Sequence, residues 1–192
     1  MIFSKDQGKT WNRFGEIPGT ESQPIQLKDG TIRIFFRNLQ DAICYADMTA
    51  VGDTYEMRSV VNTKIPNCSS CMISALSYSK KIEGKEVVFV CCPSVVGRVD
   101  GRFNGKIFVF TLDDQNKMTL YNTYCVNGRK EKEFFAYSCM TELSDGSIGL
   151  LYEDSCKKYQ GKPQGVGYSR VVYKNIPVEE IVPNAQIDEV HK

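Results

Sequence analysis

A tyrosine and a glutamate, Tyr137 and Glu21, occupy corresponding places in two similar segments of the chain. An isolated phenol has a pKa of about 10, so at neutral pH it needs a neighbouring base to become a nucleophile. The carboxylate of Glu21 is a suitable base. By residue type alone, a half-buried strand tyrosine is the favoured interpretation of Tyr137, and the alternative for Glu21 is a solvated carboxylate at a strand edge. Their matching places favour a nucleophile with its base.

The match rests on two hairpins that align without a gap, Leu27-Lys28-Asp29-Gly30-Thr31-Ile32 with Leu143-Ser144-Asp145-Gly146-Ser147-Ile148. Each has an Asp-Gly turn between strand-forming residues, which predicts a tight antiparallel hairpin. Glu21 and Tyr137 each lie six residues before the leucine. Arg37 and Glu153 each lie ten residues after it. Glu153 is therefore the residue equivalent to Arg37 in the aligned hairpin. The alternative is that Glu153 is a plain surface charge on a strand.

Two arginines, Arg37 and Arg102, are candidates for binding an anion. A guanidinium group binds a carboxylate through two parallel charge-assisted hydrogen bonds. A phenol suits as nucleophile when the attacked carbon itself bears a carboxylate, because a second anion would be repelled. Sialic acids have such an anomeric carbon, and their hydrolases use a tyrosine. The alternatives are that Arg37 snorkels across an apolar strand face and that Arg102 is an ordinary loop arginine.

The rest of the chain reads as further short strands. A looser third copy of the hairpin, in which Ser70-Cys71-Met72 resembles Ser138-Cys139-Met140, runs through residues 69–90, beside the copies at 21–37 and 137–153. Further strands are predicted at Ala42–Ala46, Lys106–Leu112 and Met118–Tyr124, and a single helical turn at Pro177–Ile181. The turn glycines of the three copies are 54 and 62 residues apart, which is typical of propeller blades. We therefore predict an all-β protein, a partial β-propeller of about three four-stranded blades.

The composition excludes several classes of protein. The chain has 192 residues, of which 42% are hydrophobic and 24% charged, as in an ordinary globular domain. A net charge of +1 offers no electrostatic basis for binding nucleic acid or an anionic membrane. No apolar run approaches the roughly 20 residues of a membrane span, and the first residues lack the apolar region of a signal peptide. We expect a soluble chain that carries no export signal of its own.

The eight cysteines are too few for a disulfide scaffold of this length, so we expect free thiols. Cys68 and Cys71 with the vicinal pair Cys91-Cys92 suggest a zinc site, but the second pair lacks a two-residue gap. Packed strand thiols are favoured over zinc. The single histidine, His191, lies near the end of the chain and suits no histidine mechanism. The sequence predicts no metal ion and no cofactor.

With these motifs, the sequence resembles the bacterial-type sialidases (neuraminidases), and most closely the secreted clostridial members. Ser4-Lys5-Asp6-Gln7-Gly8-Lys9-Thr10-Trp11 fits the Asp-box of the family, a structural turn in which Ser4 and Asp6 bond local backbone, Gly8 takes a positive φ and Trp11 packs underneath. A second box is degraded at Ala46–Asp53. The segments Thr20–Gln23, Phe35–Asn38, Arg102–Gly105, Ala136–Cys139 and Leu151–Glu153 match five further family motifs in the correct order.

The resemblance assigns a role to each candidate residue. It implies that Tyr137 is the nucleophile, that Glu21 activates it, and that Arg37 and Arg102 are the second and third arginines of the substrate-binding triad. Glu153 would orient the first arginine. Arg98 competes with Arg102, which is favoured because Asn-Gly follows it at the family spacing.

The resemblance also predicts how the chain relates to a family catalytic domain. That domain is a six-bladed propeller whose N-terminal half carries the first arginine and the acid/base aspartate. Residues 1–192 would then be a C-terminal portion of it, and three blades do not close a ring on their own. The predicted activity is exo-α-sialidase hydrolysis, with retention, of sialylated glycoproteins, glycolipids and oligosaccharides. The alternatives are an inactive propeller that binds sialoglycans and a trans-sialidase. For a full-length member, a secreted or cell-surface location is implied.

Overall fold

The computed structural model describes residues 2–13, 15–67, 71–94, 102–127, 133–155 and 169–188. Almost every regular element is a strand, as predicted. The strands are β1 (Ile2–Phe3), β2 (Asn12–Arg13), β3 (Thr20–Gln26), β4 (Ile32–Arg37), β5 (Ala42–Val51), β6 (Thr54–Met57), β7 (Val61–Pro66), β8 (Ser74–Ser77), β9 (Lys81–Ile82), β10 (Val87–Pro93), β11 (Gly105–Leu112), β12 (Met118–Cys125), β13 (Ala136–Glu142), β14 (Ile148–Ser155), β15 (Ser169–Ile176) and β16 (Ile187–Asp188). The helical turn predicted near Pro177 is α1 (Val178–Ile181).

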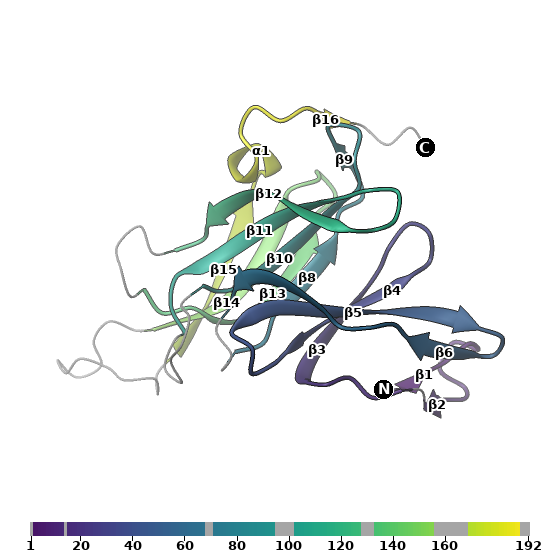
Figure 1. Cartoon of the computed structure of the whole chain (residues 1–192). Coiled ribbons are helices and arrows are strands. Elements are labelled where there is room, and N and C mark those ends of the chain that lie inside the picture. The colour runs from purple at the N-terminus through teal and green to yellow at the C-terminus, as the bar shows by residue number, and fades with distance from the viewer. Residues whose placement is uncertain are drawn as a thin grey trace.

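Three antiparallel sheets succeed one another across the molecule (Figure 1). The first has the order β3-β4-β5-β6, with β7 also paired to β5, the second β8-β10-β11-β12 and the third β13-β14-β15. Their first strands are neighbours, because β8 packs against both β3 and β13. This arrangement agrees with about three consecutive blades. In the described part of the chain the blades have five, four and three strands, where four each was expected.

The core lies between the sheets, and β10 shows how the sequence builds it. Every residue of this strand is buried. Val87, Phe89 and Cys91 join the cluster shared with the third sheet and α1, whereas Val88 and Val90 join the cluster shared with the first sheet. Alternate side chains of a strand point to opposite faces, so a continuous apolar run suits a strand covered on both sides.

The two aligned hairpins fold alike. Leu27 N–H donates to Thr31 O at 2.9 Å, and Leu143 N–H donates to Ser147 O at the same distance. The turn glycines have φ of +88° and +84°, a left-handed conformation that glycine adopts without steric cost. In the third copy the equivalent bond runs from Tyr78 N–H to Val87 O, at 3.0 Å. Tyr78 therefore stands where the other hairpins have leucine, and the turn at Gly84 belongs to an inserted segment that includes β9.

A buried arginine joins the first two sheets. Arg33 is 1% exposed and donates from Nε and Nη2 to the carboxylate oxygens of Asp47, at 2.7 and 2.8 Å. Nη2 also donates to Asn116 O, in the turn between β11 and β12, at 2.8 Å. The guanidinium carbon lies 4.1 Å from the centroid of the Tyr45 ring. These contacts connect β4 and β5 to the neighbouring blade.

The Asp-box forms the predicted turn between β1 and β2. Asp6 Oδ1 accepts from Thr10 N–H at 2.8 Å, and Ser4 Oγ accepts from Gly8 N–H at 2.7 Å. The hydrogen bonds from Thr10, above all that of its hydroxyl, lower the pKa of Asp6 to about 2. Trp11 is not the covered apolar anchor that was predicted: the residue is 60% exposed, although its indole N–H donates back to Gly8 O of the turn at 3.1 Å. Most of the degraded second box, Ala46–Asp53, lies in β5.

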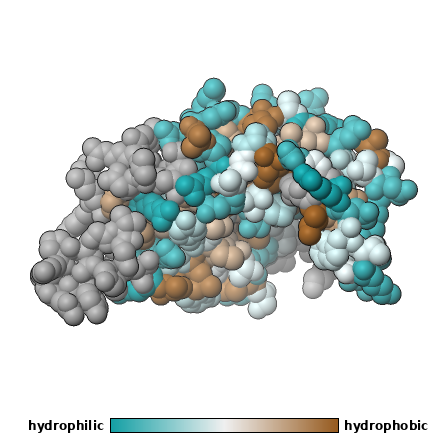
Figure 2. All heavy atoms as spheres, turned by 90° about the horizontal axis from the view of Figure 1, so that it is seen from below, coloured by the Kyte–Doolittle hydropathy of each residue, from teal (hydrophilic) through white to brown (hydrophobic). Residues whose placement is uncertain are grey.

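The surface of the described residues is mixed. Seen from below, it is mostly hydrophilic, with separate hydrophobic patches (Figure 2). The single helix of the described residues is far too short to cross a membrane.

Candidate active site

Glu21 and Tyr137 share an unusual backbone conformation. Each lies in a bulge, Glu21 in the β3–β4 pairing and Tyr137 in the β13–β14 pairing. Both have a φ of 44°. A left-handed backbone costs a residue with a side chain about 1–2 kcal/mol, and strain of this kind gathers at functional sites. The equivalence of the two places, which the alignment predicts, is thus confirmed by the backbone.

The strands opposite the bulges present Arg37 and Glu153. Arg37 pairs with Thr20, and Glu153 pairs with Ala136, so each faces the residue just before its bulge. The two hairpins therefore match in strand register as well as in turn chemistry. Glu153 is partly buried beside the Tyr137 bulge.

Arg37 forms an ion pair with Glu21. Its Nη1 lies 2.9 Å from Glu21 Oε2, and the two side chains are 30% and 33% exposed. The pKa of Arg37 is raised, first by this hydrogen bond and then by the charges of Glu21, Tyr137 and Cys71, although desolvation opposes the change. A hollow of about 420 Å³ has Arg37 in its wall. Its lining is Pro18, Gly19, Thr20, Arg37, Asn38 and Leu39. An incoming anion can therefore reach Arg37 from solvent.

Arg102 is held by the segment that follows it. The Arg102 carbonyl accepts from Phe135 N–H at 2.8 Å, which ties this loop to the start of β13. Asn104 has a φ of 57°, a conformation that asparagine tolerates better than most residues. A Cβ at Gly105 would overlap the Phe135 ring, so only glycine fits there. The Arg-x-Asn-Gly pattern thus has a structural reason.

The side chains of Arg102 and Tyr137 meet. Arg102 Nη2 donates to the Tyr137 hydroxyl oxygen at 3.0 Å, and its guanidinium carbon lies 4.8 Å from the centre of the phenol ring. The guanidinium thus holds the phenol oxygen and lies over the ring. Arg98, the competing arginine, lies outside the described residues.

The structure brings the candidates together as two pairs, Glu21 with Arg37 and Tyr137 with Arg102. Glu21 and Tyr137 lie on β3 and β13, which both pack against β8. A direct hydrogen bond between Glu21 and Tyr137 is not among the contacts of the described residues. The reason is that β8 lies between β3 and β13.

Sequence reasoning missed one residue at this site, Cys71, whose sulfur accepts from Tyr137 N–H at 3.4 Å. A signal for it existed in the third hairpin. With Tyr78 in the place of the leucine, the position equivalent to Tyr137 is Met72, next to Cys71. The sequence comparison instead matched Ser70-Cys71-Met72 with Ser138-Cys139-Met140, which shifts this copy by three residues.

The cysteines of the described ranges are free thiols. Burial raises the pKa of Cys91 to about 12, so this thiol stays protonated at neutral pH. Within the same ranges, no three side chains of histidine, cysteine, aspartate or glutamate gather to hold a metal ion. Cys68 and His191 lie outside the described residues.

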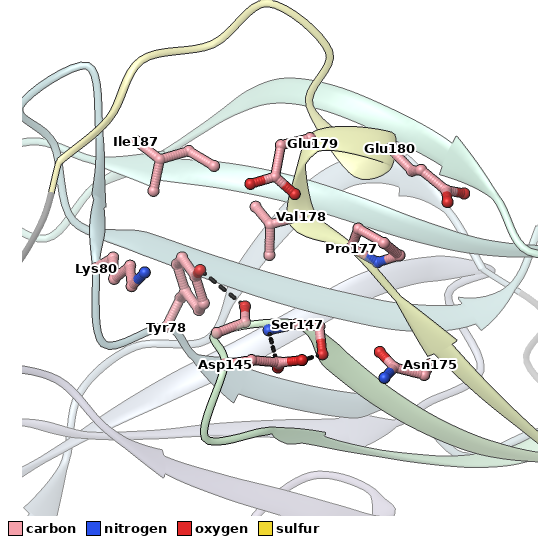
Figure 3. Close-up of a pocket in the computed structure, with 11 residues that line it drawn as sticks. Tyr78, Lys80, Asp145, Ser147, Asn175, Pro177, Val178, Glu179, Glu180 and Ile187 are labelled. Carbon is pink, nitrogen blue, oxygen red and sulfur yellow. Dashed lines mark hydrogen bonds between the residues drawn. The ribbon is translucent and has the colours of Figure 1, made fainter.

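A second hollow, of about 440 Å³, lies at the turn end of the third sheet (Figure 3). There the Tyr78 hydroxyl donates to Gly146 O at 2.9 Å, and Asp145 accepts from the N–H and hydroxyl of Ser147. Asp145 is separated from Tyr137 by the length of β13, so this hollow is distinct from the candidate active site. In its wall, Tyr78 is bonded to Gly146 and Asp145 to Ser147, whereas Lys80, Asn175 and Glu179 line the hollow without such a bond to another described residue of the wall.

Comparison with known proteins places the chain. No family model matches it. Sialidase B of Streptococcus pneumoniae is 30% identical over 157 residues, which are 79% of this chain and 22% of that protein. Anhydrosialidase of Macrobdella decora is 27% identical over 165 residues, which are 80% of this chain and 21% of that protein. The sialidase of Paraclostridium sordellii is 28% identical over 164 residues, with 80% and 39% covered.

Solved structures agree. The intramolecular trans-sialidase of Ruminococcus gnavus, in complex with oseltamivir carboxylate, has a TM-score of 0.71 at 25% identity, with 94% of this chain and 38% of that chain covered. For the NanB sialidase of Streptococcus pneumoniae the TM-score is 0.73 at 28% identity, with 94% and 27% covered. The chain belongs to the bacterial-type sialidase family. The all-β fold and the likeness to sialidase propellers are thereby confirmed.

Membership of the sialidase family leaves the finer assignments open. The chain spans 21–39% of the length of the three curated relatives named above. Clostridial, streptococcal and leech relatives match at similar identity, so a special closeness to the clostridial sialidases stays a prediction. The same holds for the division of the domain into blades and for the roles of the five candidate residues.

Proposed function

We propose that these blades form the nucleophile side of an exo-α-sialidase active site. Tyr137 attacks the anomeric carbon of a terminal sialic acid while Glu21 takes the phenol proton. The glycosidic C–O bond breaks, and the leaving oxygen is protonated by an acid that the family resemblance assigns to the N-terminal half of the domain. Water then releases the sugar from the tyrosine with retained configuration.

The observation that carries this proposal is the pair of matching bulges at Glu21 and Tyr137. Two strained residues of complementary chemistry stand at equivalent places, each beside an arginine. The sialic acid carboxylate would be bound by Arg37 and Arg102. In doing so it competes with Glu21 for one guanidinium and with the Tyr137 oxygen for the other. Substrate binding would therefore release the base and the nucleophile to act together, with Glu153 supporting the site from the neighbouring strand.

A fluorogenic α-sialoside tests the proposal on the full chain. Turnover that disappears in Tyr137→Phe supports it. A slow sialoside that carries fluorine on its ring should also add the mass of one fluorosialyl group to the wild type and none to Tyr137→Phe. Binding of sialic acid without turnover or labelling would instead favour a sialoglycan-binding propeller. If the chain neither binds nor turns over the sugar, the proposal fails for this chain.

The relatives favour a second candidate, intramolecular transfer. One curated relative is named an anhydrosialidase and one solved structure is an intramolecular trans-sialidase. In such a reaction a hydroxyl of the sialic acid itself, rather than water, takes the sialyl group from Tyr137. Mass analysis of the product separates the two, because the anhydro sugar lacks one water relative to free sialic acid. Transfer to a galactoside would appear as a new sialylated oligosaccharide when lactose is added.

A further inference from the structure

The backbone of Tyr137 is held in an unusual way. Its φ of 44° and its bulge take its N–H out of the β13–β14 hydrogen-bond pattern. The N–H donates instead to Cys71 Sγ, at 3.4 Å. Sulfur accepts hydrogen bonds weakly but at longer range than oxygen. A strained residue persists only where its surroundings hold it there, and this contact is one of those that do so.

Cys71 is well placed to hold another residue. It is fully buried and packs with Phe134 and Ala136, and with the partly buried Phe103 and Tyr137. It lies just before β8, the strand between the two that carry Glu21 and Tyr137. A buried side chain among aromatic rings has little freedom, so its sulfur is a rigid acceptor.

A second hydrogen bond links the start of β8 to β13. Ser74, at the start of β8, forms a hydrogen bond of 2.9 Å between its hydroxyl and that of Ser138. Ser138 also lies 3.4 Å from Cys91 O on β10. The second blade therefore holds two successive residues of β13, Tyr137 through its backbone and Ser138 through its side chain.

We propose that Cys71 is a positioning residue for Tyr137: its sulfur holds the backbone N–H in the bulge, and so keeps the phenol oxygen on Arg102. The importance of this for catalysis rests on the proposed function, but the positioning itself does not. A shift of the bulge would move the phenol of Tyr137 and change its contact with Arg102. Cys71 touches no reacting atom and acts only through Tyr137.

Two readouts without substrate test the proposal. In Cys71→Ala, hydrogen exchange of the Tyr137 amide should be about tenfold faster, and the ¹³C shift of the Tyr137 ring carbon that bears the hydroxyl, assigned with Tyr137→Phe, should move. Cys71→Ser, which keeps an acceptor, should restore both in large part. If Cys71→Ala does not fold, the same two measurements are made on Cys71→Val, whose side chain fills the space of the thiol but has no hydrogen-bond acceptor.

The matched control is Cys92→Ala, which removes another fully buried thiol, in the cluster with the first sheet. It should leave both readouts at the wild-type value. Unchanged exchange and ring shift in Cys71→Ala, or equal changes in Cys92→Ala, would overturn the proposal. If the chain turns over a sialoside, Cys71→Ala should lower kcat about tenfold with little change in KM. If it does not, the two readouts still decide whether Cys71 positions Tyr137, separately from the proposed function.

Discussion

Replacing Glu21 by glutamine should separate binding of sialic acid from its turnover. In the structure Glu21 holds Arg37 at 2.9 Å, and both side chains are about one-third exposed. An ion pair with this exposure contributes about 0.2–1 kcal/mol, and a bound carboxylate must displace it. Without that competition, the affinity for free sialic acid should rise by up to about fivefold, since 1.4 kcal/mol is tenfold. Turnover should fall, because an amide cannot take the Tyr137 proton.

Isothermal titration with sialic acid, at low and at high salt, measures this effect. The gain in affinity in Glu21→Gln should shrink at high salt, because screening already weakens an ion pair that is about one-third exposed. Glu56→Gln is the matched control, as it removes the same charge from an exposed residue of β6 far from Arg37 in the register. Weaker binding in Glu21→Gln than in wild type would refute the argument, because Glu21 would then be helping to hold the ligand rather than competing with it.

Three further predictions concern stability and titration. Arg33→Met should lower the free energy of unfolding in urea by about 3 kcal/mol, because it leaves the carboxylate of Asp47 without its buried partner; a loss below about 1 kcal/mol would contradict this. The Asp6 turn should be fully bonded above pH 4 and open as the pH falls through about 2, since its folded-state pKa is lowered. The NMR chemical shift of the Thr10 amide should follow this titration in the wild type, and should show no such titration in Asp6→Asn. Burial, helped by nearby carboxylates, raises the pKa of Tyr78 to about 12, so folding stability should decline between pH 10 and 12, and less steeply in Tyr78→Phe. An equal decline in both proteins, followed by circular dichroism, would show that Tyr78 titrates normally.

Much of the fold could be predicted because its signals are local. The hairpins at Asp29-Gly30 and Asp145-Gly146 follow from turn chemistry and strand alternation. Their alignment places Glu21 and Tyr137 at equivalent positions, and both positions are bulges with the same backbone conformation. The third hairpin was misaligned by three residues. An insertion that includes the short strand β9 separates Tyr78 from Val87. The similarity of residue types in this segment therefore predicted a different register from the one that the backbone hydrogen bonds show.

Trp11 shows that a local sequence motif does not determine the burial of a side chain. Its place in the Asp-box sequence is regular, yet whether an aromatic ring is covered depends on what packs against the turn, and here the ring is mostly exposed.

The sequence alone determined which residues are available for chemistry, the all-β architecture and the repeat that places Glu21 and Tyr137 at equivalent points. These depend on residues close together in the chain. Only the tertiary structure decided the contacts: Arg37 with Glu21, Arg102 with Tyr137, and the sulfur of Cys71 on the Tyr137 backbone. The last two join different blades, and such contacts are set by how the sheets stack, which no local pattern encodes.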